Sequence, residues 1–386
     1  MKIGIPKETL AGETRVALAP SAVPGLLKKK HEVIVEAGAG AASFLSDDDY
    51  VKAGATVVQS ALEVYEAADI VFKVQPPGVH PDSGRQEVDL LREGTAFVGF
   101  LAPFNNPDII RALKQRKITG FSMEFVPRIT RAQSMDALSS MATLAGYKAV
   151  LIAADRLPRM FPLLTTAAGT IAPSTVLVLG AGVAGLQAIA TAKRLGARVE
   201  AFDPRPVVKE QVESLGAVFI PMETAEDAQT AGGYAKEMGD DFLRREREAI
   251  AGRLPKCHVV VTTAQIFGKR APVLITEDMV KLMPRGAVIV DLAAEQGGNC
   301  ELTRAGESVD LHGVTVIGAL NLPATLPINA SQMYSKNVVT LFDHLYKDPE
   351  KGLDFEDEIT RGACLTHAGE IRNDLVRQAV EPDKEA

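Results

Sequence analysis

Short runs of apolar, mostly β-branched residues recur along the chain, and between them apolar residues repeat every three or four positions. The short runs predict buried strands, and the longer spacing predicts amphipathic helices. In the first third of the chain, strands are expected at residues 2–5, 32–36, 70–74, 96–101 and 118–123, and helices near 21–30, 57–67 and 107–116. This alternation is typical of βαβ units on a mostly parallel sheet.

The same pattern resumes after residue 175. Strands are expected at 176–179, 217–220, 259–262, 287–292 and 314–317, with a helix near 277–283. A proline-spaced loop and a further helix follow over residues 321–345. Because the second sheet is complete before this helix begins, we expect the helix to cross back and pack on the N-terminal region of the chain.

The strand at 176–179 is followed directly by glycines with the spacing G-x-G-x-x-G and then by a helical pattern. In this context the first glycine permits a tight turn, the second lets backbone approach a pyrophosphate, and the third lets the helix pack on its strand. The N–H groups of such a helix point at the phosphates. Candidate dinucleotide contacts are therefore Gly180, Gly182, Val183 and Gly185.

Asp203 ends the next expected strand, about 20 residues after these glycines. A carboxylate at this point accepts hydrogen bonds from the adenosine ribose and repels a 2′-phosphate, which favours NAD(H) over NADP(H). Arg205 complicates this interpretation, because an arginine near the acid can hold a 2′-phosphate. With Asp203 present, we expect Arg205 to flank the adenosine without reversing the preference.

A polar loop over residues 127–136 leads into a helix that reaches residue 156. Leu138, Met141, Leu144 and Ala145 are expected to form the buried stripe of this helix. The loop concentrates the polar residues Arg128, Arg131, Gln133, Ser134 and Asp136. Loops on a rigid scaffold often carry function, but the same residues fit a solvated loop in which Ser134 or Asp136 caps the helix.

A charged stretch over residues 223–248 is long for a loop of an α/β fold and contains the pair Gly233 and Tyr234. It is either a mobile lid that carries one aromatic or a loop that Tyr234 anchors to the surface. Residues 263–265 and 295–299 follow strands, where open α/β sheets bind ligands. Gly38 and Gly40 also follow a strand, but no acid stands at the required distance, so an ordinary turn is favoured.

Composition narrows the function classes. A chain of 386 residues is long enough for two domains. Its net charge of −7 and lack of a basic tract make nucleic acid an unexpected partner. Cys257, Cys300 and Cys364 are widely spaced, which predicts structural thiols in a reducing compartment and no metal site. The sequence shows no export leader and no uninterrupted apolar run that would span a membrane.

Several segments carry a resemblance to a known family: MKIGIPKE, VPRITRAQSMDALSS, TAGGYAKEMGDDF, VTTAQIFGKRAPVLIT and VIVDLAAEQGGNC. Together with the glycine turn they resemble the NAD(H)-binding component of proton-translocating transhydrogenases over nearly the whole chain. A more distant similarity is to alanine dehydrogenases, which share the fold. The resemblance implies an α/β chain of two Rossmann-like domains with parallel sheets separated by a cleft, one a doubly wound dinucleotide-binding domain. The expected limits are 1–137 with 320–386, of alanine dehydrogenase N-terminal type, and 138–319.

The resemblance also implies a role for each matching position. The nicotinamide and its ribose would be surrounded by Arg128, Gln133, Asp136 and Ser139, with Gln133 nearest the transferred hydride. Gly233 and Tyr234 match a loop that closes over the nucleotide. Ala264 and Gln265 match a strand-end contact, although Gln265 stands where an aliphatic residue is expected.

The implied function is direct hydride transfer between NAD(H) on this chain and NADP(H) on a partner component. It would be coupled to proton movement through a membrane-spanning proton-channel component. Transfer between two nicotinamides releases no substrate proton, so the site needs positioning and dryness more than a general base. The resemblance further implies a homodimer that is cytoplasmic and peripheral at the inner face of the bacterial plasma membrane, without a membrane span of its own.

Two alternatives remain. Alanine dehydrogenase activity would use Arg15 and Lys73, which stand where that family binds its substrate, but Phe100 replaces the family's histidine and Glu295 its aspartate. We therefore expect Arg15 and Lys73 to be structural ion-pair residues or inherited ones. A non-catalytic NAD-binding subunit is the second alternative, and the RAQSMD segment counts against it because binding alone needs no amide facing the nicotinamide.

Overall fold

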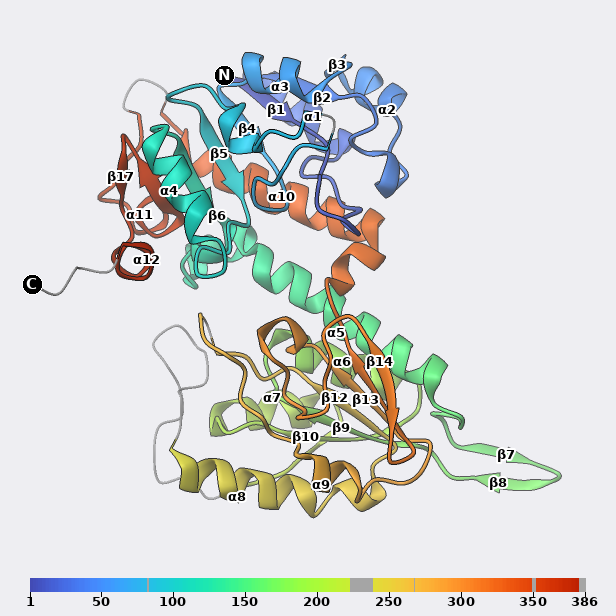
Figure 1. Ribbon diagram of the computed structural model, residues 1–386. Helices are drawn as coiled ribbons and strands as arrows, with labels where there is room; N and C mark the ends of the chain where they lie inside the picture. The colour runs from blue at the N-terminus through green and yellow to red at the C-terminus, as the bar shows by residue number, and fades with distance from the viewer. Residues whose placement is uncertain (82, 223–238, 267, 349–351, 382–386) are drawn as a thin grey trace, which may run out of the picture. The chain divides into compact units, whose positions relative to one another are not determined.

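The computed structural model describes residues 1–81, 83–222, 239–266, 268–348 and 352–381 (Figure 1). The chain divides into two compact units. Unit 1 comprises Met1–Met141 and Ala324–Ala386, and unit 2 comprises Ala142–Pro323. Each unit is built on one large, mostly parallel sheet, so the expected α/β class is confirmed.

The sheet of unit 2 has the strand order β11-β10-β9-β12-β13-β15-β14. Its strands are β9 (Thr175–Leu179), β10 (Arg198–Phe202), β11 (Val218–Phe219), β12 (Val259–Thr262), β13 (Val288–Asp291), β14 (Ser308–Leu311) and β15 (Val314–Gly318). All neighbours are parallel except β14, which pairs antiparallel with β15. Without β14 the order is that of doubly wound dinucleotide-binding folds, whose ligands bind where the order reverses, here between β9 and β12.

Both faces of this sheet are buried. Val176 and Val178 face one apolar layer, and Leu177 and Leu179 face the other. The first layer is covered by α5 (Ala137–Arg156), α6 (Val183–Arg194) and α7 (Lys209–Ser214), and the second by α8 (Asp240–Ala251) and α9 (Glu277–Val280). Burial on both faces explains why these strands are unbroken apolar runs in the sequence.

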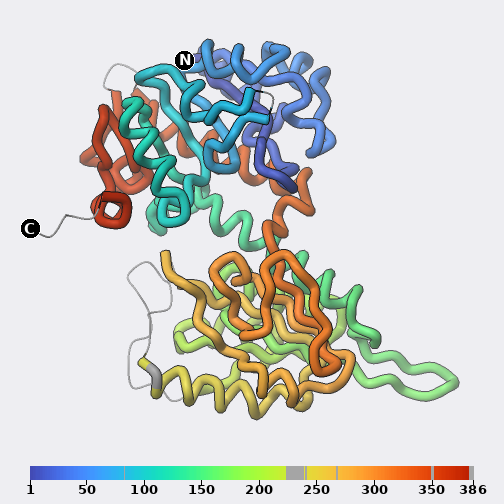
Figure 2. The backbone as a smooth tube through the Cα atoms, viewed as in Figure 1, coloured from blue at the N-terminus to red at the C-terminus, as the bar shows by residue number. Residues whose placement is uncertain are grey.

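The sheet of unit 1 has the order β17-β16-β6-β5-β4-β1-β2-β3. Its strands are β1 (Lys2–Ile5), β2 (Glu32–Glu36), β3 (Thr56–Val58), β4 (Ile70–Phe72), β5 (Ala96–Gly99), β6 (Thr119–Ser122), β16 (Cys364–His367) and β17 (Glu370–Ile371). Strands β1 to β6 are parallel and repeat the topology of unit 2. Strand β16 pairs antiparallel with β6, so the end of the chain extends the sheet formed by its beginning (Figure 2).

The helices of unit 1 are α1 (Val23–Lys28), α2 (Asp47–Ala53), α3 (Ala61–Ala67), α4 (Pro107–Gln115), α10 (Pro327–Leu345), α11 (Glu358–Ala363) and α12 (Asp374–Val380). The helix expected after the proline-spaced loop is α10, and it packs in unit 1. Tyr334, Val338 and Leu341 on this helix are fully buried. The Tyr334 hydroxyl donates to the Lys73 carbonyl at 2.7 Å, which ties α10 to the end of β4.

Several elements differ from the sequence expectation. Residues 57 and 58 belong to strand β3, and α3 begins only after Ser60, whose hydroxyl accepts from the Glu63 N–H. Helix α2 was not expected because only Tyr50 of its seven residues is buried. On α5, Met141 is buried but Leu138, Leu144 and Ala145 are only partly so, and the fully buried positions are small or β-branched, such as Ala149, Val150 and Ala153.

The charged stretch over residues 223–248 is not all loop, because α8 begins at residue 240. Its buried residues Phe242, Glu246 and Ile250 recur every fourth position. An acid in the middle of the stripe hid the helical pattern from sequence reasoning. The apolar segment around residue 165 forms a hairpin of β7 (Leu164–Thr166) and β8 (Gly169–Ile171), which extends from unit 2 with every strand residue exposed (Figure 1).

One helix among the described residues, α5, has the length and the mean hydropathy, 1.4, of a membrane span. The sequence had suggested no such span. A third of that window is buried, and Ala149, Val150 and Ala153 pack into the core of unit 2. The apolar residues of α5 pack on the sheet of unit 2. Its length and hydropathy are therefore weak evidence that this helix spans a membrane.

Replacing Gly146 on α5 by alanine is expected to destabilise unit 2 by about 1 to 3 kcal/mol, the usual cost of overpacking. A Cβ at this position would lie 2.0 Å from the carbonyl oxygen of Ala184 on α6. This clash outweighs the better helix propensity of alanine, which is worth roughly 1 kcal/mol. Calorimetric unfolding of the full chain measures the difference.

Gly252→Ala is the matched control in the same unit, because a Cβ there meets no atom of the described residues closer than 3.8 Å. Its unfolding temperature is expected to stay the same or rise slightly. Equal stability of the two variants would show that α5 and α6 do not pack this closely.

Candidate functional site

The turn from β9 into α6 depends on two glycines for internal reasons. Gly180 has φ +96°, and a Cβ there would lie 2.5 Å from the Thr263 hydroxyl oxygen. A Cβ at Gly185 would lie 1.8 Å from the Gly180 carbonyl oxygen. The predicted tight turn and the close packing of helix on strand are therefore both present.

Gly182 is different, because among the described residues a Cβ built on it meets no atom within 4 Å. No contact with the part of the chain that the structure describes requires a glycine at this position. Gly182 is also the N-cap of α6, and no described side chain caps the helix there. The first N–H groups of a 12-residue helix are thus left for another acceptor. Open space beside an uncapped helix start fits a pyrophosphate.

Asp203 lies beside this turn and is 5% exposed. One carboxylate oxygen, Oδ2, accepts from the Ala181 N–H at 2.7 Å and from Arg205 Nη2 at 2.8 Å. The other, Oδ1, accepts from the Arg205 backbone N–H at 2.9 Å and from Arg205 Nε at 2.8 Å. The hydrogen bond to Asp203 raises the pKa of Arg205. The structure therefore brings the predicted acid and arginine into one buried ion pair at the glycine turn.

The end of β12 completes this edge of the sheet. The Thr263 hydroxyl donates to the Gly180 carbonyl at 3.1 Å, and the Ala264 N–H lies against the same glycine. Ala264 is held from the next strand end by Asn299, which accepts from its N–H at 3.0 Å and donates to its carbonyl at 2.8 Å. Gln265 is exposed and donates to the Leu292 carbonyl at 3.0 Å.

Sequence reasoning did not select Asp291 at the end of β13. This fully buried carboxylate accepts five hydrogen bonds, from Thr262, Ala293, Asn299, Cys300 and Thr303. It orders the loop that presents Asn299 to Ala264. An acid closing an otherwise apolar strand, VIVD, was the available signal.

Gly233 and Tyr234 lie outside the described residues. The helix after them carries a carboxyl that the sequence did not single out, Glu246, which is 4% exposed on the buried face of α8. Burial raises the pKa of Glu246 to about 7, and the negative charge of Asp203 adds to the rise. The charge of Arg247 acts in the opposite direction.

The loop expected to face the nicotinamide lies in unit 1 as the 3₁₀ helix η5 (Thr130–Met135). Ala132 and Met135 anchor it as buried residues. Its backbone is held by α10, where the Asn337 amide donates to the Ser134 carbonyl at 2.9 Å. Its Arg131 guanidinium lies 3.3 Å from the Asp357 carboxylate. Contacts with the rest of unit 1 therefore hold this loop in place. The sequence alone indicated neither Asn337 nor Asp357 as a partner of the loop.

Asp136 caps α5. Its carboxylate accepts from the Ser139 N–H at 2.8 Å and from the Ser139 hydroxyl at 2.6 Å, so the capping interpretation is confirmed for Asp136. Gln133 and Arg128 on the same loop are exposed. Among the described residues the Gln133 side chain makes no hydrogen bond, so its amide is available to a ligand. These four residues belong to unit 1 or its first turn of α5, whereas the glycine turn belongs to unit 2.

Unit 1 has buried charges at the carboxyl ends of β1 and β4, its own switch point. Lys73 is fully buried, and its ammonium donates to both oxygens of Glu87 at 2.8 and 2.6 Å. Arg15 forms a two-pronged pair with Glu13, with contacts of 2.8 and 2.6 Å. The expected ion pairs of Arg15 and Lys73 are confirmed.

The carboxyls around these cations differ in their pKa values. Burial by itself would raise the pKa of Glu13, but the hydrogen bonds and charge of Arg15 outweigh it and lower the pKa to about 2. Burial raises the pKa of Glu8 to about 7 against the opposing charge of Lys73. The cations thus already have anionic partners.

The remaining candidates are structural. A Cβ at Gly40 would lie 2.9 Å from the Tyr50 ring, so Gly40 belongs to a packed turn. Cys257, Cys300 and Cys364 are buried free thiols. No group of three potential metal ligands occurs among the residues that the structure describes.

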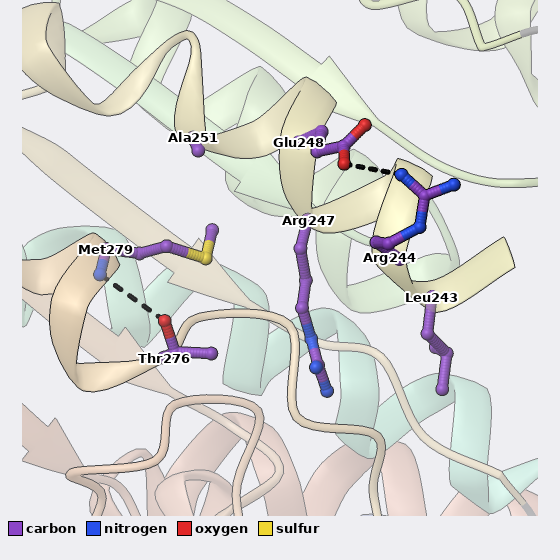
Figure 3. Close-up of a pocket in the computed structure, with 7 residues that line it drawn as sticks. All are labelled: Leu243, Arg244, Arg247, Glu248, Ala251, Thr276 and Met279. Atoms are coloured by element: carbon purple, nitrogen blue, oxygen red, sulfur yellow. Dashed lines mark hydrogen bonds and ion pairs between the residues drawn. The ribbon is translucent and has the colours of Figure 1, made fainter. Parts of the chain in front are cut away.

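A pocket of about 420 Å³ lies between α8 and α9 (Figure 3). It is lined by Leu243, Arg244, Arg247, Glu248, Ala251, Thr276 and Met279. Arg244 is paired with Glu248, and Arg247 donates to the Val273 carbonyl at 2.9 Å. None of the predicted site residues lines this pocket, so it is separate from the glycine turn.

Comparison with known proteins gives consistent matches. The family model described as Alanine dehydrogenase/PNT, N-terminal domain, matches residues 4–145, and that of the C-terminal domain matches residues 149–374. A Rhodospirillum rubrum protein, named as the first part of NAD(P) transhydrogenase subunit alpha, is 49% identical over 375 residues, covering 96% of this chain and 97% of that protein. The crystal structure of transhydrogenase from Sinorhizobium meliloti has a TM-score of 0.86 and 40% identity, covering 96% and 100%. An L-alanine dehydrogenase structure has a TM-score of 0.81 and 26% identity, covering 98% and 99%.

The Glu246 carboxyl predicts a specific pH dependence of stability. The unfolded chain releases this proton near the ordinary value of 4.5, whereas the folded chain holds it to about 7. Between these values the folded state binds more protons, so stability falls as pH rises, by on the order of 3 kcal/mol. Glu246→Gln removes this loss, and its stability advantage over the wild type should grow from pH 5 to pH 8.

Urea unfolding at several pH values measures this advantage. Glu248→Gln is the control, because Glu248 is exposed two residues further along the same helix. For that variant the difference from the wild type should not change over this window. A constant difference for Glu246→Gln as well would mean that Glu246 is already ionised in the folded protein at pH 5.

Proposed function

The chain belongs to the alanine dehydrogenase/PNT family, and from this premise we propose that it is the NAD(H)-binding component of a proton-translocating transhydrogenase. In this function, hydride passes directly between NAD(H) on this chain and NADP(H) on a partner component. The bound nicotinamide supplies or accepts the hydride. The residues of this chain bind and orient the nucleotide and keep water away from the nicotinamide.

One observation carries this function over amino acid oxidation. Lys73 and Arg15, the cations that an alanine dehydrogenase would need for its substrate, are buried in ion pairs with Glu87 and Glu13. A substrate carboxylate would have to compete with two carboxylates that already hold these cations. By contrast, the helix start at Gly182 has open space beside it and no side-chain cap, as far as the described residues extend.

The proposed division of work follows the chain. The N–H groups at Gly182 and Val183 bind the pyrophosphate, and Gly180 and Gly185 shape the turn that presents them. Asp203 recognises the adenosine ribose, with Arg205 beside it and with Ala264 and Gln265 at the neighbouring strand end. Gln133, Arg128, Asp136 and Ser139 position the nicotinamide and its ribose, and Gly233 with Tyr234 covers the nucleotide. No residue has to act as a general base, because no proton leaves the substrate.

The proposed partners are an NADP(H)-binding component and a membrane-spanning component that conducts protons. The chain would act in the cytoplasm, peripherally at the inner face of the bacterial plasma membrane. It would form a homodimer. Names of relatives support this assembly, since the Rhodospirillum rubrum protein is called a part of a subunit. A non-catalytic NAD-binding role is less favoured, because it gives Gln133 no function.

The test is hydride transfer from NADH to an NADP analogue on the partner component, followed by stopped-flow spectroscopy. Gln133→Asn is expected to slow transfer by about 100-fold, because withdrawing the amide by about an ångström misplaces the nicotinamide. NADH affinity should be nearly unchanged, since most binding contacts lie at the glycine turn and Asp203.

Gln378→Asn on α12 is the control, because it makes the same chemical change at another exposed glutamine of unit 1. Its transfer rate should match the wild type. An unchanged rate for Gln133→Asn would remove Gln133 from the catalytic residues. No transfer by the wild-type complex would remove the proposed function itself.

The proposed homodimer gives a further prediction. Leu164 and Ile171 on the β7–β8 hairpin are 36% and 45% exposed, which leaves apolar surface for a second copy to cover. Substituting both by aspartate should produce monomers at micromolar concentration in sedimentation velocity. Leu375→Asp is the control, since Leu375 is 62% exposed on α12 of unit 1 and is not part of the hairpin. A dimer that survives the double substitution would exclude the hairpin as its interface.

A further inference from the structure

The Asp203 carboxylate has no acceptor position left for a ribose. An ionised carboxylate offers about four lone-pair positions on its two oxygens. In this structure Ala181 fills one with its N–H, and Arg205 fills three with its backbone N–H, Nε and Nη2. The distances, 2.7 to 2.9 Å, are those of full hydrogen bonds.

Access is restricted as well. The Asp203 side chain is 3% exposed, and that of Arg205 is 13% exposed. The guanidinium therefore covers the carboxylate that the ribose must reach. The Ala181 N–H and the Arg205 N–H are backbone groups, so only the two side-chain contacts of Arg205 can be exchanged without moving the turn.

We propose that Arg205 is a specificity-determining latch on Asp203, which must leave the carboxylate before the adenosine ribose of NAD(H) can bind. The inference rests on the proposed function for its ligand, NAD(H). It adds that NAD(H) must break the contacts between Arg205 and Asp203 in order to bind. Each NAD(H) that binds exchanges two charge-assisted hydrogen bonds of the ion pair for hydrogen bonds from the 2′- and 3′-hydroxyls. The side chain reduces NAD(H) affinity when it is present.

The latch also narrows the discrimination between the two dinucleotides. A bare carboxylate repels a 2′-phosphate, but an arginine displaced from that carboxylate remains next to the ribose as a partner for the phosphate. Arg205 thus weakens NAD(H) and favours NADP(H) relative to a site with Asp203 alone. Its removal should change both affinities in opposite directions.

Calorimetric titration of the full chain with NADH and with NADPH tests this, and it needs no partner component. Arg205→Met keeps the length of the side chain but removes its donors and charge. It should bind NADH about tenfold more tightly, the scale of one charge-assisted hydrogen bond. It should bind NADPH more weakly than the wild type. Equal or weaker NADH binding by Arg205→Met would overturn the latch.

Two further variants keep the test sharp. Arg205→Lys retains the charge but donates from a single nitrogen, so it should tighten NADH binding less than Arg205→Met without weakening NADPH binding. If Arg205→Met does not fold, NADH binding by Arg205→Lys that is no tighter than the wild type's overturns the latch. Arg198→Met removes an exposed arginine at the other end of β10 and should leave both affinities unchanged.

Failure of the latch and failure of the proposed function are distinguishable. A wild-type chain that binds NADH but transfers no hydride in the reconstituted complex overturns the function and leaves the latch standing. A complex that transfers hydride normally, built with an Arg205→Met chain of unchanged NADH affinity, overturns the latch and leaves the function standing.

Discussion

The rest of unit 2 depends on one close contact, the approach of α6 to β9. The Gly185 backbone passes so near the Gly180 carbonyl that no side chain fits, and α5 approaches the same helix start through Gly146 against Ala184. These contacts fix where α6 begins and which way its N–H groups point. Because β9 and β12 flank the switch point of the sheet, the helix start faces the edge where ligands bind.

Asp203 links the geometry of the glycine turn to the positive charge of Arg205. The carboxylate holds the Ala181 N–H and the Arg205 guanidinium at once, so the geometry of the turn and the charge next to it are coupled. The pair is buried, and a buried pair is stable only while both partners stay satisfied. Glu246 faces the same region from α8 as a buried acid. At the turn that we propose for the adenosine end of NAD(H), the charges of Asp203, Arg205 and Glu246 therefore depend on one another.

The two units use one topology in two ways. The six parallel strands of each sheet follow the same order, and each sheet has a switch point at the carboxyl ends of its central strands. In unit 2 that edge carries a glycine turn with an open helix start. In unit 1 it carries Lys73, Glu87, Arg15 and Glu13, all satisfied by one another and by backbone. The same fold can therefore present a ligand site or a closed ionic core, and side chains alone decide which.

The sequence by itself determined the α/β class, the parallel strands and the glycine turn, because these follow from local apolar periodicity and from conformations that only glycine adopts. It also indicated that Arg15 and Lys73 pair. Only the tertiary structure decided the rest. Glu246 on the buried stripe of α8, Asn337 under the η5 loop and Arg205 across Asp203 are contacts between residues whose roles local spacing does not encode. Charge pairing and burial depend on which residues the fold brings together, and the local order of residues along the chain does not specify these contacts.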